Sequence, residues 1–176
     1  MATLEDLLGD PGNATVWRLD PQRSRIAFSC RSFWGLLPVK GTFSDFGGDG
    51  QLANGAAFGR VDINAASLDT GIGKRDDHLR SDDFFAVERF PTISVVVTAV
   101  LSNGGGGAEL RSNLTVRGVT HPVPLPATVS VLDGDAVQIS TRVTVDRTRW
   151  EVSGNLMGMV MRPTTLVATG VFVKSR

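Results

Sequence analysis

The sequence has no tyrosine, a single cysteine and only two histidines in 176 residues. The lone cysteine, Cys30, cannot form an internal disulfide, and its neighbours Ile26 and Phe28 indicate a small hydrophobic residue rather than a nucleophile. No tyrosine is present to act as an acid, and neither His78 nor His121 belongs to a recognisable metal-ligand spacing. The residues that most often carry acid–base or metal chemistry are therefore scarce.

The chain also lacks net charge and long apolar runs. Lysine plus arginine (18) equals aspartate plus glutamate (18), so nucleic acid is not an expected partner. No stretch approaches the ~20 consecutive apolar residues that span a bilayer, and we expect no membrane span. Residues 1–10 are acidic where a signal peptide is basic and contain no long apolar core, so we expect a cytoplasmic protein.

A chain of this length fits one domain whose core needs no disulfide or metal. We expect a single domain over residues 15–176, preceded by a flexible or short helical extension over residues 1–14.

Alternating apolar and polar residues recur along the chain, as in strands with one buried face. In residues 24–31, Ile26, Phe28 and Cys30 share one face of a period-two pattern. The same alternation marks the other expected strands: Val39–Phe43, Val61–Ile63, Ile93–Val95, Leu114–Val116, Val137–Val145 and Leu166–Val173.

Glycine clusters separate these runs and can supply the positive φ angles of tight turns. They lie at Gly47–Gly50, Asn103–Gly107 and Asp133–Asp135, so we expect successive strands to be antiparallel neighbours. About eight strands with hairpin spacing suit either a sandwich or a barrel, and the pattern alone does not choose between them.

One charged segment breaks the β pattern and predicts a short helical insertion near residues 74–85. Asp76 or Asp77 would lie near its N-terminus, where a carboxylate satisfies free backbone N–H groups. Pro91 marks the return to strand.

Several longer motifs lie in order along residues 16–173. They are Trp17-Arg-Leu-Asp-Pro21, Val39-Lys-Gly-Thr-Phe43, Ser67-Leu-Asp-Thr-Gly71, the run from Arg75 to Phe85, Val87-Glu-Arg-Phe-Pro-Thr-Ile93, the run from Leu114 to His121, and Asp146-Arg-Thr-Arg-Trp150. In these motifs the sequence resembles the YceI-like family of polyisoprenoid-binding proteins. It departs from the family after Trp150, where residues 151–161 lack the expected acidic, glycine-led turn.

The resemblance implies an all-β fold, an eight-stranded antiparallel lipocalin-like β-barrel with an apolar tunnel. It implies that the tunnel takes up a polyisoprenoid, or a quinone-like or fatty-acid-like lipid, without a cofactor. It also implies a homodimer, since members of the family are often dimeric.

An apolar tunnel alone can hold such a ligand. Burying about twenty methylene groups gives on the order of 16 kcal/mol of gross driving force, from which ordering costs are subtracted. The candidate wall residues lie on the apolar face of their strands. For each of them the alternative is packing in a dry core. They are Ile26, Phe28, Val39, Phe43, Val61, Ile63, Ile93, Val95, Leu114, Val116 and Val143.

Aromatic and methionine side chains add further candidates. Phe84 and Phe85 are adjacent and cannot point the same way, so we expect one to cover the tunnel mouth and the other to seal against a strand, unless both are core. Met157 and Met159 would share one face of a strand, and their flexible side chains suit either a lipid-binding wall or ordinary gap filling.

The polar insertion offers candidate contacts to a lipid head group. Arg75, His78 and Arg80 could meet a phosphate or a quinone. The alternative is a solvated helix face stabilised by the neighbouring aspartates.

The sequence thus favours a non-catalytic carrier of a long-chain polyisoprenoid or related amphiphilic lipid. One alternative is a protein-interaction module with a filled barrel. Another is a lipid-processing enzyme with His78 as base, although no Gly-x-Ser-x-Gly elbow is present.

Overall fold

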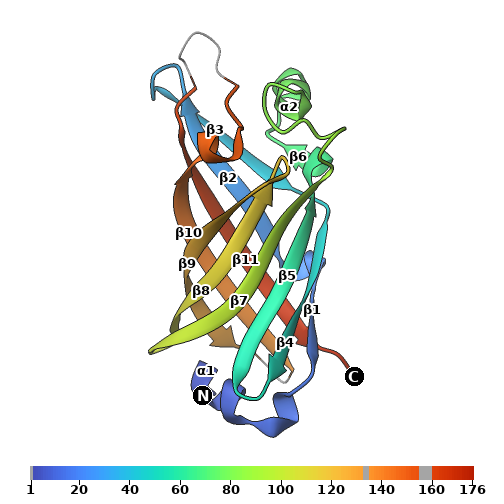
Figure 1. The fold of residues 1–176 in the computed structure, drawn as a ribbon, viewed down its shortest axis with the longest axis vertical. Helices are drawn as coiled ribbons and strands as arrows, with labels where there is room; N and C mark the ends of the chain where they lie inside the picture. The colour runs from blue at the N-terminus through green and yellow to red at the C-terminus, as the bar shows by residue number, and fades with distance from the viewer. Residues whose placement is uncertain (1, 133–134, 155–159) are drawn as a thin grey trace.

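The computed structural model describes residues 2–132, 135–154 and 160–176 and shows a β-barrel with a short helix at each end (Figure 1). Its helices are α1 (Leu4–Gly9) and α2 (Gly73–Arg80). Its strands are β1 (Val16–Leu19), β2 (Arg25–Ser32), β3 (Leu37–Phe43), β4 (Phe46–Ala53), β5 (Ala56–Asn64), β6 (Leu68–Asp69), β7 (Thr92–Gly104), β8 (Gly107–Val116), β9 (Val119–Val131), β10 (Ala136–Asp146) and β11 (Pro163–Lys174). Single 3-10 turns lie at Pro11–Asn13, Pro21–Arg23, Ala65–Ser67 and Arg147–Trp150.

The sheet closes into a barrel. It has eight strands when each of three interrupted strands is counted once. β1 continues into β2, β3 into β4, and β5 into β6. At one end of the barrel β11 pairs with β1 and β1 with β4, while at the other end β11 pairs with β2 and β2 with β3. All pairings are antiparallel, and the order β4-β5-β7-β8-β9-β10-β11 completes the ring. The expected eight-stranded antiparallel barrel is confirmed.

Strand β4 runs through Gly47–Gly50, which we predicted as a hairpin turn, so that prediction was wrong. A Cβ on Gly48 would lie 2.3 Å from the carbonyl oxygen of Arg60, and one on Gly59 would lie 2.6 Å from that of Asp49. The glycines are needed because the backbones of β4 and β5 approach each other too closely for side chains.

The hairpin between β4 and β5 turns instead at Asn54-Gly55, where φ is 53° and 77°. An Asn-Gly pair is the usual sequence of a type I′ turn. The predicted turn at Asn103–Gly107 is confirmed, with positive φ at Gly105 and Gly106. The one predicted at Asp133–Asp135 lies partly outside the described residues.

Strand β9 contains Pro122, Pro124 and Pro126. β9 pairs with β8 over residues 119–128 but with β10 only over residues 127–131. Its first half is therefore a sheet edge, where proline is tolerated because no N–H donor is needed. The prolines also prevent another strand from adding there.

Helix α1 lies at the lower end of the barrel in Figure 1. Thr3 and Asp6 form a capping box, in which each side chain accepts a hydrogen bond from the other residue's backbone N–H. Leu4 and Leu7 are buried in a cluster with Trp17.

Helix α2 lies at the opposite, upper end (Figure 1). It confirms the helical insertion but ends at Arg80, and residues 81–89 continue as turns. In the described part of the chain, no helix combines the length and hydropathy that a bilayer crossing requires.

Candidate functional site

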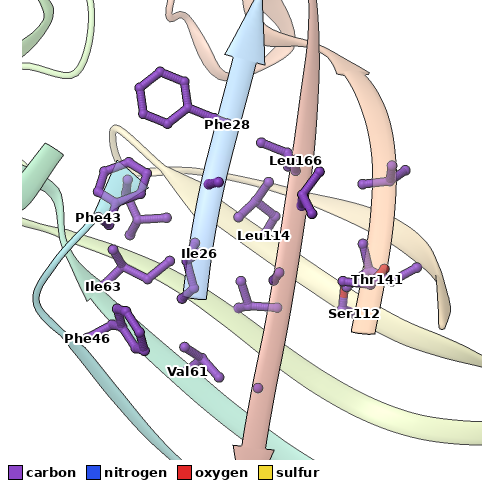
Figure 2. Close-up of a pocket in the computed structure, with 18 of the residues that line it drawn as sticks. Ile26, Phe28, Phe43, Phe46, Val61, Ile63, Ser112, Leu114, Thr141 and Leu166 are labelled. Carbon is purple, nitrogen blue, oxygen red and sulfur yellow. The ribbon is translucent and has the colours of Figure 1, made fainter. Parts of the chain in front are cut away.

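A cavity of about 750 Å³ runs inside the barrel from α1 to α2. This volume lies within the range of about 300–1,000 Å³ that is typical of small-molecule sites. Inward-facing residues of the strands form its wall, and Figure 2 shows Ile26, Phe43, Ile63 and Leu114 around the same space.

The wall residues are less covered than a packed core would be. Ile26, Val61, Val95, Val143 and Leu166 line the cavity and are only half-buried, although they belong to the inward face of their strands. A filled barrel would cover them with other side chains. The barrel therefore has a hollow interior.

Two hydroxyl groups in the wall donate to backbone carbonyls of β9. The Ser112 hydroxyl donates to the carbonyl of Val123 at 2.7 Å, and the Thr141 hydroxyl donates to that of Pro126 at 2.7 Å. These two wall residues (Figure 2) therefore need no hydrogen bond from a ligand, and the wall is compatible with a hydrocarbon.

Three phenylalanines meet in the upper half of the cavity. The ring of Phe85 lies 6.2 Å from those of both Phe28 and Phe43, and the latter two are 5.4 Å apart. Phe85 thus packs against β2 and β3, from the loop that follows α2.

Phe84 faces a different, polar set of neighbours. Its buried ring lies edge-on to His78 at 5.2 Å and 5.7 Å from the guanidinium carbon of Arg147. His78 Nε2 lies 2.9 Å from a carboxylate oxygen of Asp83, and both of these side chains are partly exposed. As expected, the adjacent Phe84 and Phe85 have different partners, and both line the cavity.

Arg147 brings a buried cation to the cavity wall. Its guanidinium donates to the carbonyls of Val152 at 2.5 Å, Met161 at 3.1 Å and Val160 at 3.1 Å. Burial lowers the pKa of Arg147, but a guanidinium stays protonated in proteins. No carboxylate in residues 2–132, 135–154 or 160–176 is within ion-pair distance of it.

Cys30 also lines the cavity. Burial raises the pKa of its thiol, and the positive charges of Arg147 and Arg75 oppose this only in part. The thiol is therefore protonated at neutral pH, as expected for a structural cysteine.

Arg75 lines the cavity and holds the approach to α2. Its Nε donates to the hydroxyl of Thr70 at 2.8 Å, and a carboxylate oxygen of Asp76 accepts from the Thr70 N–H at 2.9 Å. Asp76 therefore binds the preceding turn and does not cap the helix, because the N-cap residue is Ile72, which makes no side-chain hydrogen bond. The expectation that Asp76 or Asp77 would satisfy the helix N-terminus was wrong.

Two further arginines fix the loop around α2. Arg80 donates to the carbonyls of Ala66 at 2.9 Å and Leu68 at 2.8 Å. Arg117, from the β8–β9 turn, donates to the carbonyls of Asp82 at 2.5 Å and Phe84 at 2.7 Å. Arg80 is thus occupied with backbone carbonyls.

The structure brings most of the candidate residues together around one cavity. Arg80 is not part of the cavity wall, and Met157 and Met159 lie outside the described residues. The candidates that line the cavity are Ile26, Phe28, Val39, Phe43, Val61, Ile63, His78, Phe84, Phe85, Ile93, Val95, Leu114, Val116 and Val143.

Sequence reasoning missed several wall residues. Trp150 is almost completely buried and donates from Nε1 to the carbonyl of Leu114 at 2.8 Å. Leu4 and Leu7 line the lower end of the cavity, and the capping box in front of them was a readable signal. Arg147 had no such signal, because its role depends on contacts distant in sequence. No cluster of three or more potential metal ligands occurs among the described residues.

Comparison with known proteins assigns the chain to a family. The sequence model of the YceI-like domain matches residues 17–174. The chain belongs to the YceI-like family. Relatives named UPF0312 proteins are 35% identical over 127 residues in Ectopseudomonas mendocina and 37% identical over 128 residues in Shewanella denitrificans. Each alignment covers 69% of this chain but only 65% of the relative.

Solved structures share the fold at low identity. BcnA of Burkholderia cenocepacia has a TM-score of 0.78 at 21% identity, covering 87% of this chain and 98% of BcnA. A polyisoprenoid binding domain from Saccharophagus degradans has a TM-score of 0.75 at 15% identity, covering 90% and 98%. Both similarities support the barrel fold.

Proposed function

We propose that this YceI-like protein binds and carries a long-chain polyisoprenoid or a related amphiphilic lipid, without catalysing a reaction on it. The observation that carries the proposal is the apolar cavity of about 750 Å³ along the barrel. The polyisoprenoid binding domain from Saccharophagus degradans, which shares the fold, supports this class of ligand.

The polar groups indicate how the lipid is oriented. Apolar residues of α1, Leu4 and Leu7, line the lower end of the cavity, while Arg75, His78 and Arg147 line its upper end. Because Arg147 is a buried cation without an ion-pair partner in the described residues, a polar or anionic head group is favoured beside it. The hydrocarbon tail would then extend toward α1.

The experiment is a titration with cis-parinaric acid, a fluorescent fatty acid, followed by displacement with farnesol and longer prenols. A variant that fills the cavity, Val95→Trp, places a large ring where the wall is only half-buried. We expect its affinity to fall by more than about tenfold, while the barrel stays folded because the added ring enters empty space.

The matched control is Leu101→Trp on the same strand. Leu101 is exposed and is not part of the cavity wall, so this variant should bind like the unaltered chain. Equal binding by Val95→Trp and the unaltered chain would contradict the proposal. The filled-barrel alternative instead predicts that Val95→Trp does not fold.

A further inference from the structure

Exposed apolar side chains gather at the upper end of the barrel. Three of them lie in the turn between β2 and β3, which extends beyond the barrel wall in Figure 1, and the fourth is the first residue of β3. We call these residues the hydrophobic tip: Phe33, Trp34, Leu36 and Leu37, which are 46%, 69%, 79% and 51% exposed. Single exposed apolar residues are common, but four within five consecutive residues are not.

The hydrophobic tip is continuous with the cavity. Phe33 and Leu37 belong to the cavity wall, and so does Ile72 at the start of α2. Because all three are about half exposed, the cavity reaches solvent between the tip and α2. Trp34 and Leu36 are not part of the wall.

The backbone of the tip is unfavourable for the residues it carries. Phe33 and Trp34 have φ of 50° and 55°, in the left-handed region that favours glycine or asparagine. Large aromatic residues at two consecutive positions of this kind are a strained arrangement, and such strain is concentrated at functional sites.

The charged residues on the two strands that carry the tip are basic. No acidic residue occurs between Asp20 and Asp45, and exposed Arg31 and Lys40 flank the tip on β2 and β3. Met161, whose N–H donates to the carbonyl of Arg31 at 2.9 Å, brings exposed Arg162 to the same place.

We propose that the hydrophobic tip inserts into the surface of a bilayer that contains anionic lipids. Tryptophan and leucine side chains partition into the interfacial region of a bilayer, and flanking arginine and lysine are attracted to anionic head groups. The cavity mouth would then face the membrane, so a lipid could pass between bilayer and barrel without crossing water. Only this last step rests on the proposed function.

A second copy of the chain is a poorer occupant for the same surface. Two tips meeting each other would bring Arg31, Lys40 and Arg162 of both copies together, and like charges repel. An anionic bilayer complements both the apolar and the charged part of the surface.

The chain contains its own reporter for the test. Trp17 and Trp150 are 5% and 2% exposed, whereas Trp34 is 69% exposed. Changes of tryptophan emission on addition of vesicles therefore report mainly on Trp34. We expect a blue shift with phosphatidylglycerol–phosphatidylcholine vesicles, quenching by brominated acyl chains, and a weaker response at high salt or with phosphatidylcholine alone.

Sedimentation with the same vesicles compares two variants. Trp34→Ser combined with Leu36→Ser should reduce the bound fraction by about tenfold or more, because the inserted apolar surface is lost. The control Leu101→Ser removes an exposed apolar residue of β7 and should bind like the unaltered chain.

Unchanged vesicle binding by the tip variant, or no spectral change of Trp34, would overturn the proposal. So would a dimer, seen by analytical ultracentrifugation, that the tip variant abolishes while vesicles remain unbound. Uptake of cis-parinaric acid without vesicles tests the cargo separately. It should be unaffected in the tip variant, since neither altered residue lines the cavity.

Discussion

The two ends of the barrel differ in their chemistry. At the lower end α1 contributes Leu4 and Leu7, which line the cavity and are buried beside Trp17. At the upper end arginines donate to backbone carbonyls, and the cavity-lining residues Phe33 and Ile72 are about half exposed. Because α1 covers the lower end with buried side chains, we infer that a ligand exchanges through the upper end.

The largest expected effect comes from the buried anchor of the upper end. Trp150→Ala should lower the free energy of unfolding by about 3–5 kcal/mol, because it leaves a cavity and removes the hydrogen bond to Leu114. Urea unfolding measures this. Trp34→Ser is the matched control, and its exposed position should keep the change within about 0.5 kcal/mol.

A smaller effect is expected from the loop around α2. Arg117→Gln removes charge-assisted hydrogen bonds to the carbonyls of Asp82 and Phe84 and should cost about 1.5 kcal/mol. Release of bound cis-parinaric acid, followed by stopped flow, should accelerate. Arg142→Gln, at an exposed position on β10, should change neither quantity. Release at an unchanged rate from the Arg117 variant would count against exchange at the upper end.

A substitution in α1, at the lower end of the barrel, should destabilise the structure mainly in that helix. Leu7→Ala removes a buried contact of α1, a loss of about 2 kcal/mol or more at an ordinary core site. Because α1 is terminal, we expect much of this to appear as local opening. Hydrogen exchange should accelerate in α1 but not in β8, and the global unfolding free energy should fall by less than in Trp150→Ala. Equal losses would show that α1 belongs to the cooperative core.

The smallest change is a chemical one at Cys30. Because burial raises the pKa of this thiol, its thiolate fraction at pH 8 lies below that of an ordinary cysteine with a pKa of about 8.5. Alkylation by iodoacetamide should therefore be slow at pH 8 and accelerate as the pH rises through the elevated pKa. A saturating lipid should slow it further, and alkylation as fast as that of free cysteine would contradict this.

Much of the barrel could be predicted because its strands alternate. Ile26, Phe28 and Cys30 placed β2 correctly, and the Val137–Val145 pattern placed β10. Strand β4 was not predicted, because the close approach of Gly48 to Arg60 depends on a partner strand. Strand β9 was not predicted, because its prolines are tolerated only at a sheet edge and the sequence does not show where such an edge lies.

The cavity could be predicted only in part. Alternation identifies Val95 and Leu114 as inward-facing, but the same pattern serves a filled and a hollow barrel. The distinction depends on how much of the barrel interior the side chains fill, and all of the strands together determine this. For Arg80 the side-chain charge suggested a head-group contact. In the structure its guanidinium instead donates to the backbone carbonyls of Ala66 and Leu68.

The most direct test of the account is mass spectrometry of the organic extract of the purified protein. The account predicts an isoprenoid or other long-chain lipid at near-stoichiometric amount in the unaltered chain, and its loss in Val95→Trp but not in Leu101→Trp. An unaltered chain that yields no lipid and takes up neither prenols nor fatty acids would contradict it.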